Sequence, residues 1–361
     1  MKKIKLFIVD DSAIVRQTIS KLVEDVQEIE LLGVAADPIF AMAKFKTKGI
    51  PDVLILDIDM PRMDGITFLK QIMNDKPIAT IICSSNAKSG SLKAIEALRA
   101  GAVELIEKPN IQTKSFFEQS KESLIQSIIS ASNAKLKVIK NNHSLSATKK
   151  NIQDTKIESS DDILVRKKHI PLSGGQKAIA IGSSTGGVQV IESILKSISS
   201  ATVPIMITQH MPAGFTASLA KRLDSICKVH VKQAEDGDEL QSSTAYIAPG
   251  DKHMLIKRVG LKSFITIKDG PKVSHHRPSV DILFRSFANE LGRSGTGIIL
   301  TGMGSDGARG MKEMFDNGAK TYAQDEKSCV VYGMPNEAVK LGGVVNSLSI
   351  EKIIELIQSI R

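Results

Sequence analysis

The sequence predicts an α/β fold in two domains: an N-terminal unit of five alternating strands and helices, and a C-terminal doubly wound, mostly parallel unit. The chain has 361 residues, which exceeds one ordinary domain of about 150 residues. Short β-branched runs alternate with amphipathic stretches in both halves, whereas the residues between the halves are rich in Ser, Asn, Lys and Asp. We therefore place the first domain at residues 1–130, a linker at 131–172 and the second domain at 173–361.

Buried parallel strands explain the apolar runs of the first domain, because strands covered on both faces are continuously apolar. Runs rich in β-branched residues predict strands at 4–9, 31–35, 53–56, 78–83 and 103–106. Apolar residues at helical spacing predict helices at 14–26, 66–73, 92–98 and 115–129. The alternation predicts a sheet with helices on both faces.

The linker predicted at 131–172 has few aromatic groups and no sustained hydrophobic period. Such a segment buries too little apolar area to offset the entropy of ordering, so we expect it to be flexible. In the second domain, strands are predicted at 178–181, 204–208, 245–248, 297–300 and 320–323, with helices at 188–198 and 280–291.

The composition is that of an ordinary globular protein, with 42% hydrophobic and 24% charged residues. Much of the formal net charge of +9 lies in Lys-rich stretches between residues 135 and 168, which favours a solvated linker over a nucleic-acid surface. Cys83, Cys227 and Cys329 lack disulfide or metal-site spacing, so we expect reduced packing residues. Because we find no signal peptide and no apolar run of about 18 residues, we expect a cytoplasmic protein without membrane insertion.

Polar side chains follow four of the strands predicted in the first domain. Asp10 and Asp11 follow the first strand, Asp57 the third, Ser84 the fourth and Lys108 the fifth. Ligands of open parallel sheets lie beyond the carboxyl ends of the strands, so we expect these side chains to converge on one edge. A lone Asp at a strand end would be a helix cap, but five converging polar residues indicate a site.

The chemistry of this edge is that of a metal-assisted phosphoryl site. Carboxylates that share a pocket repel each other and require a hard divalent cation, for which Mg²⁺ with oxygen ligands is suited. Neutralisation by the metal lets Asp57 attack phosphorus. Lys108 and the Ser84 hydroxyl then hold the oxygens of an aspartyl phosphate.

The segments IVDDSA, PDVLILDIDMPRMDG, CSS and EKP together resemble the response-regulator receiver family, whose fold is flavodoxin-like. The resemblance covers the whole first domain and implies that Asp57 is the phosphoacceptor. It implies that Asp10 and Asp11 serve Mg²⁺ directly or through water, with the Asp59 carbonyl as a further ligand. Leu105 departs from the family, since many receivers carry an aromatic switch residue three positions before the Lys, and we expect other packing to transmit the signal.

A nucleophile turn is predicted in the second domain, where the strand at 178–181 is followed by the helix at 188–198. The motif GSSTGG fits the pattern G-x-S-x-G in this strand-to-helix position. Its glycines allow a sharp turn that exposes the Ser184 hydroxyl, and the helix amino terminus favours developing negative charge. Ser183 is the rival nucleophile, and such a loop alone is also typical of phosphate or dinucleotide binding.

His210 is the predicted general base, because a serine hydroxyl is weakly nucleophilic at neutral pH and needs one. It ends the apolar run PIMITQHMP, at the carboxyl end of a strand next to the strand that precedes Ser184. A capping or core histidine is the structural alternative. His253, His275 and His276 are other candidates, but they lie in loops or lack an equally clear strand-end position.

Asp306 is the predicted acid that holds the imidazole tautomer. It lies in GIILTGMGSDGA and again follows an apolar strand, although a lone Asp there would be interpreted as a helix cap. The glycines around it allow close backbone approach, which leaves the Met303 amide to donate toward an oxyanion.

The motifs GSSTGG, TQHMP and TGMGSDG together resemble the catalytic domain of the CheB family of chemotaxis protein-glutamate methylesterases. With the receiver in front, the resemblance covers nearly the whole chain except the linker. It implies a triad of Ser184, His210 and Asp306, with the Met303 amide as oxyanion donor. The segment HHRPSVDILF also resembles the family's pattern and is expected to shape the rim of the active site.

The resemblance implies a phosphorylation-activated serine hydrolase that demethylates glutamate methyl esters on methyl-accepting chemotaxis receptors; some members also deamidate receptor glutamines. It implies a chemotaxis histidine kinase as phosphodonor and an unphosphorylated receiver that covers the hydrolase. The acyl-enzyme route requires no cofactor for ester hydrolysis. Ser183 stands where Ala is common and Ser305 where Asn is common, and Ser183 bears on the choice of nucleophile.

Two other classes of function compete with a hydrolase. A receiver fused to a nucleic-acid-binding module predicts an aromatic and basic patch or a helix-turn-helix, but aromatic residues are only 4% and the second domain alternates strands and helices. A nucleotide-binding output domain predicts G-x-G-x-x-G spacing and an acidic ribose partner, and the sequence has neither. We therefore expect no nucleic-acid partner.

Overall fold

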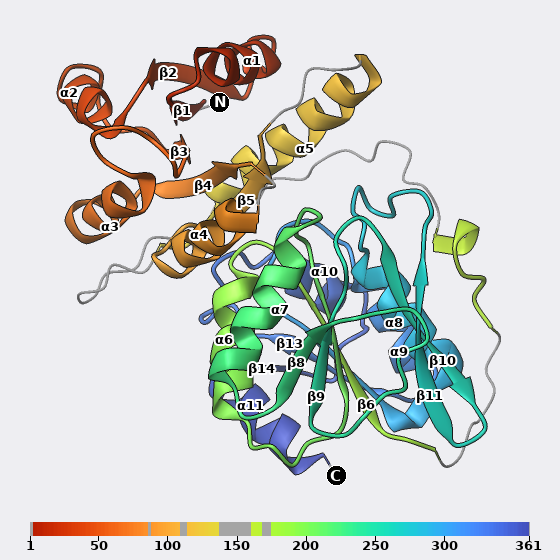
Figure 1. Cartoon of the computed structure of the whole chain (residues 1–361). Coiled ribbons are helices and arrows are strands. Elements are labelled where there is room, and N and C mark those ends of the chain that lie inside the picture. The colour runs from red at the N-terminus through yellow and green to blue at the C-terminus, as the bar shows by residue number, and fades with distance from the viewer. Residues whose placement is uncertain (1–2, 86–87, 109–113, 137–159, 168–174, 361) are drawn as a thin grey trace. The chain divides into compact units, whose positions relative to one another are not determined.

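The computed structural model describes residues 3–85, 88–108, 114–136, 160–167 and 175–360 (Figure 1). They fall into two compact units, Met1–Lys150 and Asn151–Arg361. Each unit is built on a parallel sheet with alternating helices, which confirms the predicted fold class. Of the linker predicted at 131–172, residues 137–159 and 168–172 lie outside the described residues.

The first unit is a five-stranded sheet of order β2-β1-β3-β4-β5 in which every neighbouring pair is parallel. All five predicted strands overlap the observed ones. The strands are β1 Ile4–Val9, β2 Ile29–Ala35, β3 Val53–Leu56, β4 Ala79–Ser84 and β5 Glu104–Glu107. The helices are α1 Ala13–Val23, α2 Pro38–Lys48, α3 Gly65–Asp75, α4 Lys88–Arg99 and α5 Lys114–Ser132.

Burial in the first unit follows the apolar runs. Phe7, Ile8, Leu54 and Ile55 in the two central strands are fully buried, as continuous apolar strands require. Because β1 and β3 pair side by side, the residues that follow them leave the sheet at the same edge. This pairing brings the ends of both strands, and therefore Asp10 and Asp57, together.

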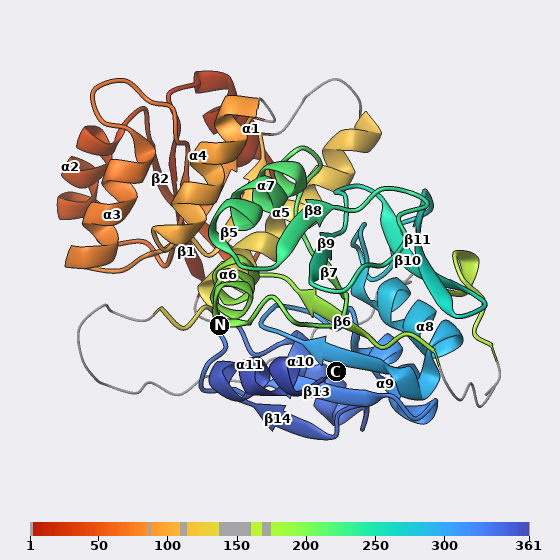
Figure 2. The same cartoon turned by 60° about the horizontal axis from the view of Figure 1, so that its bottom comes forward.

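The second unit contains a seven-stranded sheet of order β14-β13-β12-β6-β7-β9-β8, again parallel at every pair. Figure 1 shows α6, α7 and α11 on one side of this sheet and α8 and α9 on the other, and Figure 2 shows the same layers from a second direction. The strands of the sheet are β6 Ala178–Ser183, β7 Ile205–Gln209, β8 His230–Gln233, β9 Thr244–Ile247, β12 Gly295–Ile299, β13 Lys320–Gln324 and β14 Asn346–Leu348. The helices are α6 Gly187–Ser197, α7 Phe215–Ile226, α8 Val280–Glu290, α9 Ala308–Asp316, α10 Met334–Lys340 and α11 Ile350–Ser359. Across the described ranges, no helix is both long enough and apolar enough to cross a membrane.

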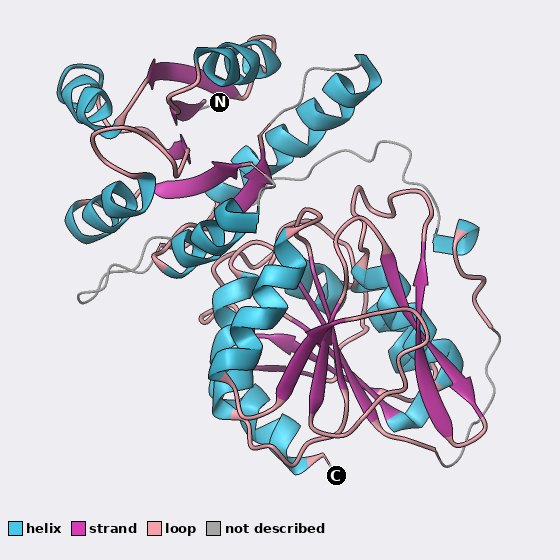
Figure 3. Cartoon of the chain, viewed as in Figure 1, coloured by secondary structure: helices cyan, strands magenta, loops and turns pink. Residues whose placement is uncertain are grey.

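A two-stranded antiparallel hairpin accompanies the sheet and was not predicted. It consists of β10 His253–Val259 and β11 Lys262–Lys268, and Figure 3 shows it as a separate pair of strands. Buried residues of the hairpin, such as Met254 and Ile265, join the same core as residues of α8. The hairpin therefore shares one hydrophobic core with α8 and the sheet.

Residues 160–167 differ from the flexible linker expected there, because they fold against the second unit. A short 3₁₀ helix, η1 (Ser160–Asp162), opens the segment, and Ser160 is buried. Ile163 and Leu164 pack on a small cluster of buried apolar residues. The composition of the whole stretch is polar, and this hides the fact that two consecutive apolar side chains, Ile163 and Leu164, can hold it against the domain.

Candidate functional site

The predicted nucleophile turn and the predicted base follow the ends of two adjacent strands, at the same height in the sheet. Ser183, the last residue of β6, pairs with Gln209, the last residue of β7. Ser184 and His210 are the next residues, and the His210 amide donates to the Ser183 carbonyl at 3.1 Å. Both residues therefore stand at the same carboxyl edge of the sheet.

Gln209 holds the nucleophile turn from within. The Ser183 hydroxyl is fully buried and donates to Gln209 Oε1 at 2.7 Å. Gln209 Nε2 donates to the Ser184 carbonyl at 3.0 Å, and the chain then enters α6 through Gly186 at φ +77°. The hydroxyl of Ser183 is thus used in the core, whereas the side chain of Ser184 lies at the edge with 9% of the residue exposed.

Asp306 follows β12, which pairs with β6 on the side opposite to β7. Four donors surround its carboxylate. Oδ2 lies 2.8 Å from His210 Nε2 and accepts from the Val280 amide at 2.7 Å. Oδ1 accepts from the Ser279 hydroxyl at 2.7 Å and from the Asp281 amide at 3.0 Å. Three of the four donors come from the N-cap Ser279 and the first two residues of α8, so the start of this helix fixes the position of Asp306.

The hydrogen bonds to Asp306 keep it ionised in a buried place. Burial alone would raise the pKa of a carboxyl group, yet the bond from His210 and the charge of its ring hold the pKa of Asp306 below its ordinary value. Asp306 therefore stays negative at neutral pH and orients the imidazole.

The ring of His210 is held by a second histidine. His276 stacks on it with ring centroids 3.6 Å apart and planes inclined by 11°. Burial, and then the charge of His210, lower the pKa of His276 well below its ordinary value, so His276 stays neutral. Nδ1 of His210 is buried and has no hydrogen-bond partner among the described residues, so it is the ring nitrogen that Asp306 does not engage.

The other candidate histidines have other places in the structure. His253 is fully buried, and its two ring nitrogens lie 2.9 Å from the Pro271 carbonyl and 3.2 Å from the Ser279 amide. His275 is exposed, with φ at +67°. Neither has the strand-edge position of His210.

The segment that contains Met303 lies against the nucleophile turn. The Ser184 amide donates to the Thr301 carbonyl at 3.0 Å. At Gly302, a Cβ atom would stand 2.7 Å from Ser184 Cβ, so only glycine allows this approach. Met303 is the next residue, and its backbone therefore begins beside Ser184.

The acidic residues of the first unit converge as expected. Ligand atoms of Asp10, Asp11 and Asp57 lie within 4.8 Å of one another. Lys108 Nζ lies 3.0 Å from Asp10 Oδ2 and 2.8 Å from Asp57 Oδ2. Buried Ser84 ends β4, and its carbonyl accepts from the Lys108 amide at 3.0 Å. All five predicted side chains of the pocket thus belong to one edge.

Electrostatics in this pocket favour binding of a cation. Burial, and then the neighbouring charge of Asp10, raise the pKa of Asp57 to about 6 against the opposing effect of Lys108. Burial likewise raises the pKa of Asp10. Three carboxylates within reach of one ion, two of them costly to ionise, fit a hard divalent cation with oxygen ligands.

Two further residues singled out in the sequence of the first unit are Asp59, whose side chain lies on the surface, and Leu105, which lies in the core. The side chain of Asp59 is exposed and pairs with Lys93, so only its carbonyl is left for the predicted metal role, which stays a prediction. Leu105 is buried in β5, at the position where an aromatic switch is common in receivers.

Sequence reasoning missed several residues that complete the second site. Gln209 was not singled out, although it lies inside the motif TQHMP. Ser279 and Asp281 lie in HHRPSVDILF, for which the sequence predicts a place at the rim, and for His276 the sequence suggests only an alternative base. The signal was present in that segment, but only the fold shows that it contacts the acid and the base together.

Comparisons with protein families divide the chain in the same way. Residues 6–116 match the response regulator receiver domain. Residues 179–357 match the CheB methylesterase family. Each match falls within one of the two compact units.

Curated relatives cover nearly the whole chain. A protein-glutamate methylesterase/protein-glutamine glutaminase of Geobacter metallireducens is 46% identical over 98% of both chains. One from Chromobacterium violaceum is 46% identical over 99% of both. The crystal structure of the Thermotoga maritima CheB methylesterase catalytic domain is 38% identical, with a TM-score of 0.50, and covers 53% of this chain and 100% of that chain. The chain therefore belongs to the CheB methylesterase family, with a response regulator receiver domain in front of the methylesterase domain.

Proposed function

We propose that this chain hydrolyses γ-carboxyl methyl esters of glutamate on methyl-accepting chemotaxis receptors, with Ser184 as nucleophile, His210 as general base and Asp306 as the acid that orients it. The observation that carries the proposal is the 2.8 Å contact between His210 Nε2 and Asp306 Oδ2, at the sheet edge where Ser184 follows β6. Family membership supports the reaction class.

Each nitrogen of His210 has its own task in the proposed reaction. Nε2 is engaged by Asp306, so Nδ1 is the atom that takes the Ser184 proton. The alkoxide attacks the ester carbonyl, and the tetrahedral intermediate expels methoxide, which receives the proton as methanol. Water, activated by the same nitrogen, then hydrolyses the acyl-enzyme and releases the glutamate. A glutamine side chain follows the same route with ammonia as the leaving group.

Backbone donors stabilise the intermediate. The amide of Met303 is the proposed oxyanion donor, since its backbone starts beside Ser184. The amino terminus of α6, which begins at Gly187 shortly after Ser184, adds positive potential at the same place. Ser183 is excluded as nucleophile in this proposal because its hydroxyl donates to Gln209 in the core.

Control is assigned to the first unit. Asp57 is the proposed phosphoacceptor, and Asp10, Asp11, Asp57 and the Asp59 carbonyl are the groups that would hold Mg²⁺, whose charge would offset theirs during phosphoryl transfer. Lys108 and Ser84 would hold the phosphoryl oxygens. A chemotaxis histidine kinase is the proposed phosphodonor, and phosphorylation shifts the chain to its active state.

Methanol release from methylated receptor, with and without a small phosphodonor, tests chemistry and control together. Ser184→Ala is expected to abolish release while Asp57 still accepts phosphate. Asp57→Asn is expected to keep the unstimulated rate and to lose stimulation by the phosphodonor. Ser183→Ala is the matched control for the nucleophile, and turnover retained by Ser184→Ala but lost by Ser183→Ala would reverse the assignment.

A further inference from the structure

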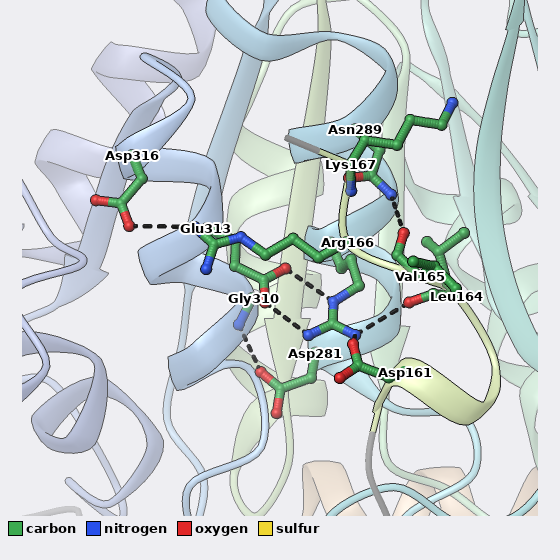
Figure 4. Close-up of polar contacts among 11 residues, drawn as sticks. Asp161, Leu164, Val165, Arg166, Lys167, Asp281, Asn289, Gly310, Glu313 and Asp316 are labelled. Atoms are coloured by element: carbon green, nitrogen blue, oxygen red, sulfur yellow. Dashed lines mark hydrogen bonds and ion pairs between the residues drawn. The ribbon is translucent and has the colours of Figure 1, made fainter. Parts of the chain in front are cut away.

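The segment of residues 160–167, here called the strap, is attached to the second unit by polar and apolar contacts. Figure 4 shows its polar contacts with α8 and α9. The Lys167 amide donates to Asn289 Oδ1 at 2.9 Å, and Asn289 Nδ2 donates to the Val165 carbonyl at 3.0 Å. This reciprocal pair fixes the strap backbone along α8. The strap is therefore part of the hydrolase fold, although it precedes the first strand of that fold.

Arg285 of α8 connects the strap to α9. Its guanidinium donates twice to Glu313, through Nε at 2.8 Å and Nη2 at 2.6 Å. Nη1 donates to Asp161 Oδ1 at 2.6 Å and to the Leu164 carbonyl at 3.0 Å. Arg285 is only 7% exposed, and such a forked, buried arrangement fixes the relative position of three segments.

The same helix pair holds the acid of the proposed triad. One turn before Arg285, Asp281 Oδ1 accepts from the Gly310 amide of α9 at 2.8 Å, which Figure 4 also shows. The Asp281 amide donates to Asp306, as does the Val280 amide. A displacement of α8 relative to α9 would therefore move donors of Asp306.

A second contact path leads from the strap to the base. Ile163 lies against Gly270, where a Cβ atom would stand 3.2 Å from Ile163 Cγ1. Ile163 also belongs to the apolar cluster that contains Val273 and Ile282. Val273 pairs by backbone hydrogen bonds with His276, whose ring stacks on His210. The strap thus supports both partners of the His210–Asp306 pair.

We propose that the strap is a positioning element of the methylesterase and that Arg285 is its main positioning residue, acting on Asp306 through α8. The proposal rests on the function proposed above, because it assumes that His210 and Asp306 work on the ester. It also assigns the carboxyl end of the linker to the hydrolase domain, so the domain starts structurally at Ser160.

A double variant of the strap, Asp161→Asn with Ile163→Ala, tests this in the full chain. Asp161→Asn weakens the contact to Arg285, and Ile163→Ala removes the apolar contact with Gly270. The Asp161 side chain is 63% exposed, so its change leaves the core intact. Asp162→Asn, at the neighbouring exposed carboxylate, is the matched control. The double variant is expected to lower kcat roughly three- to tenfold at unchanged KM, because small displacements of oriented groups cost rate.

A second measurement does not depend on turnover. In chain labelled with ¹⁵N-histidine, the proton on His210 Nε2, bonded to Asp306, is expected to shift or broaden in the double variant and to stay unchanged in Asp162→Asn. A kcat and a proton signal equal to those of Asp162→Asn would overturn the proposal, as would a rate loss that disappears at a temperature where circular dichroism shows full folding. Turnover that survives Ser184→Ala would instead reject the proposed function, while the proton signal would still report on the strap.

Discussion

Each of the two units has its site at the carboxyl edge of its own parallel sheet, but the pKa values of the buried carboxyl groups at these edges shift in opposite directions. In the first unit, Asp57 accepts one backbone hydrogen bond, from the Ile58 amide, and its carboxylate faces Lys108. Burial raises its pKa to about 6. In the second unit, Asp306 is as buried but has four donors, and its pKa is lowered. The difference teaches that the hydrogen-bond donors around a strand-end carboxylate decide its role. Asp57 has few donors and suits a cation and a phosphoryl group, whereas all the acceptor positions of Asp306 are already used.

The largest expected difference between the two sites is in the kcat of matched substitutions, Asp306→Asn and Asp57→Asn. Asp306→Asn should lower kcat by about 10⁴-fold, because an amide no longer holds the imidazole in the reactive tautomer. Asp57→Asn should leave the unstimulated kcat within about twofold, since its unit contains no reacting group of the ester. Steady-state methanol release checks both values. A small effect at Asp306 would mean that the contact to His210 does not serve the chemistry.

The same pair of substitutions is expected to change stability with opposite signs. Asp57→Asn should raise the free energy of unfolding of the first unit by about 1–2 kcal/mol at pH 7, because it removes a charge that the fold disfavours. The pKa of Asp57 is raised from 3.8 to about 6, so this gain should be full above pH 6 and should vanish below about pH 4. Asp306→Asn should lower the free energy of unfolding of the second unit by about 2–4 kcal/mol, because buried donors lose their acceptor.

Denaturant unfolding followed separately for the two units, at pH 4 and pH 7, measures these changes. A loss of stability in Asp57→Asn at pH 7 would show that the bond to Lys108 outweighs the cost of burial. Equal signs for the two substitutions would remove the contrast between the two sites.

A substitution at Asp281 is expected to have the smallest effect. The carboxyl group of Asp281 is buried next to Asp306, and its ionised form is unfavourable there. Burial, and then the charge of Asp306, raise its pKa to about 7. Asp281→Asn keeps an acceptor for the Gly310 amide and should raise the free energy of unfolding by about 1 kcal/mol at pH 8, with no gain near pH 4, where the parent carboxyl is protonated. A pH series of urea unfolding checks this, and a gain that is equal at both pH values would exclude titration of Asp281 as its cause.

The sequence was sufficient to predict the five strands of the first sheet, five of the seven strands of the second, and the strand-end positions of the polar residues, but not β8, β14 or the hairpin. Apolar runs placed Asp57 and His210 at strand ends because strands buried on both faces have a strong and local signal. The choice between Ser183 and Ser184 depends on Gln209, which pairs with Ser183 across two strands, and such a register is not contained in local spacing. The stack of His276 on His210 joins a loop to a strand end 66 residues earlier in the sequence. The strap was missed because two apolar residues in a polar stretch carry too little local signal.

The crowded surroundings of Asp306 have a consequence for where the proton travels. A carboxylate offers about four acceptor positions, and here four hydrogens already point at them. Four donors and a lowered pKa favour the carboxylate form of Asp306, so in the proposed reaction the proton stays on the ring of His210. In the proposed reaction Asp306 thus stays a fixed negative charge, beside which the imidazole gains a proton and returns it in each turnover.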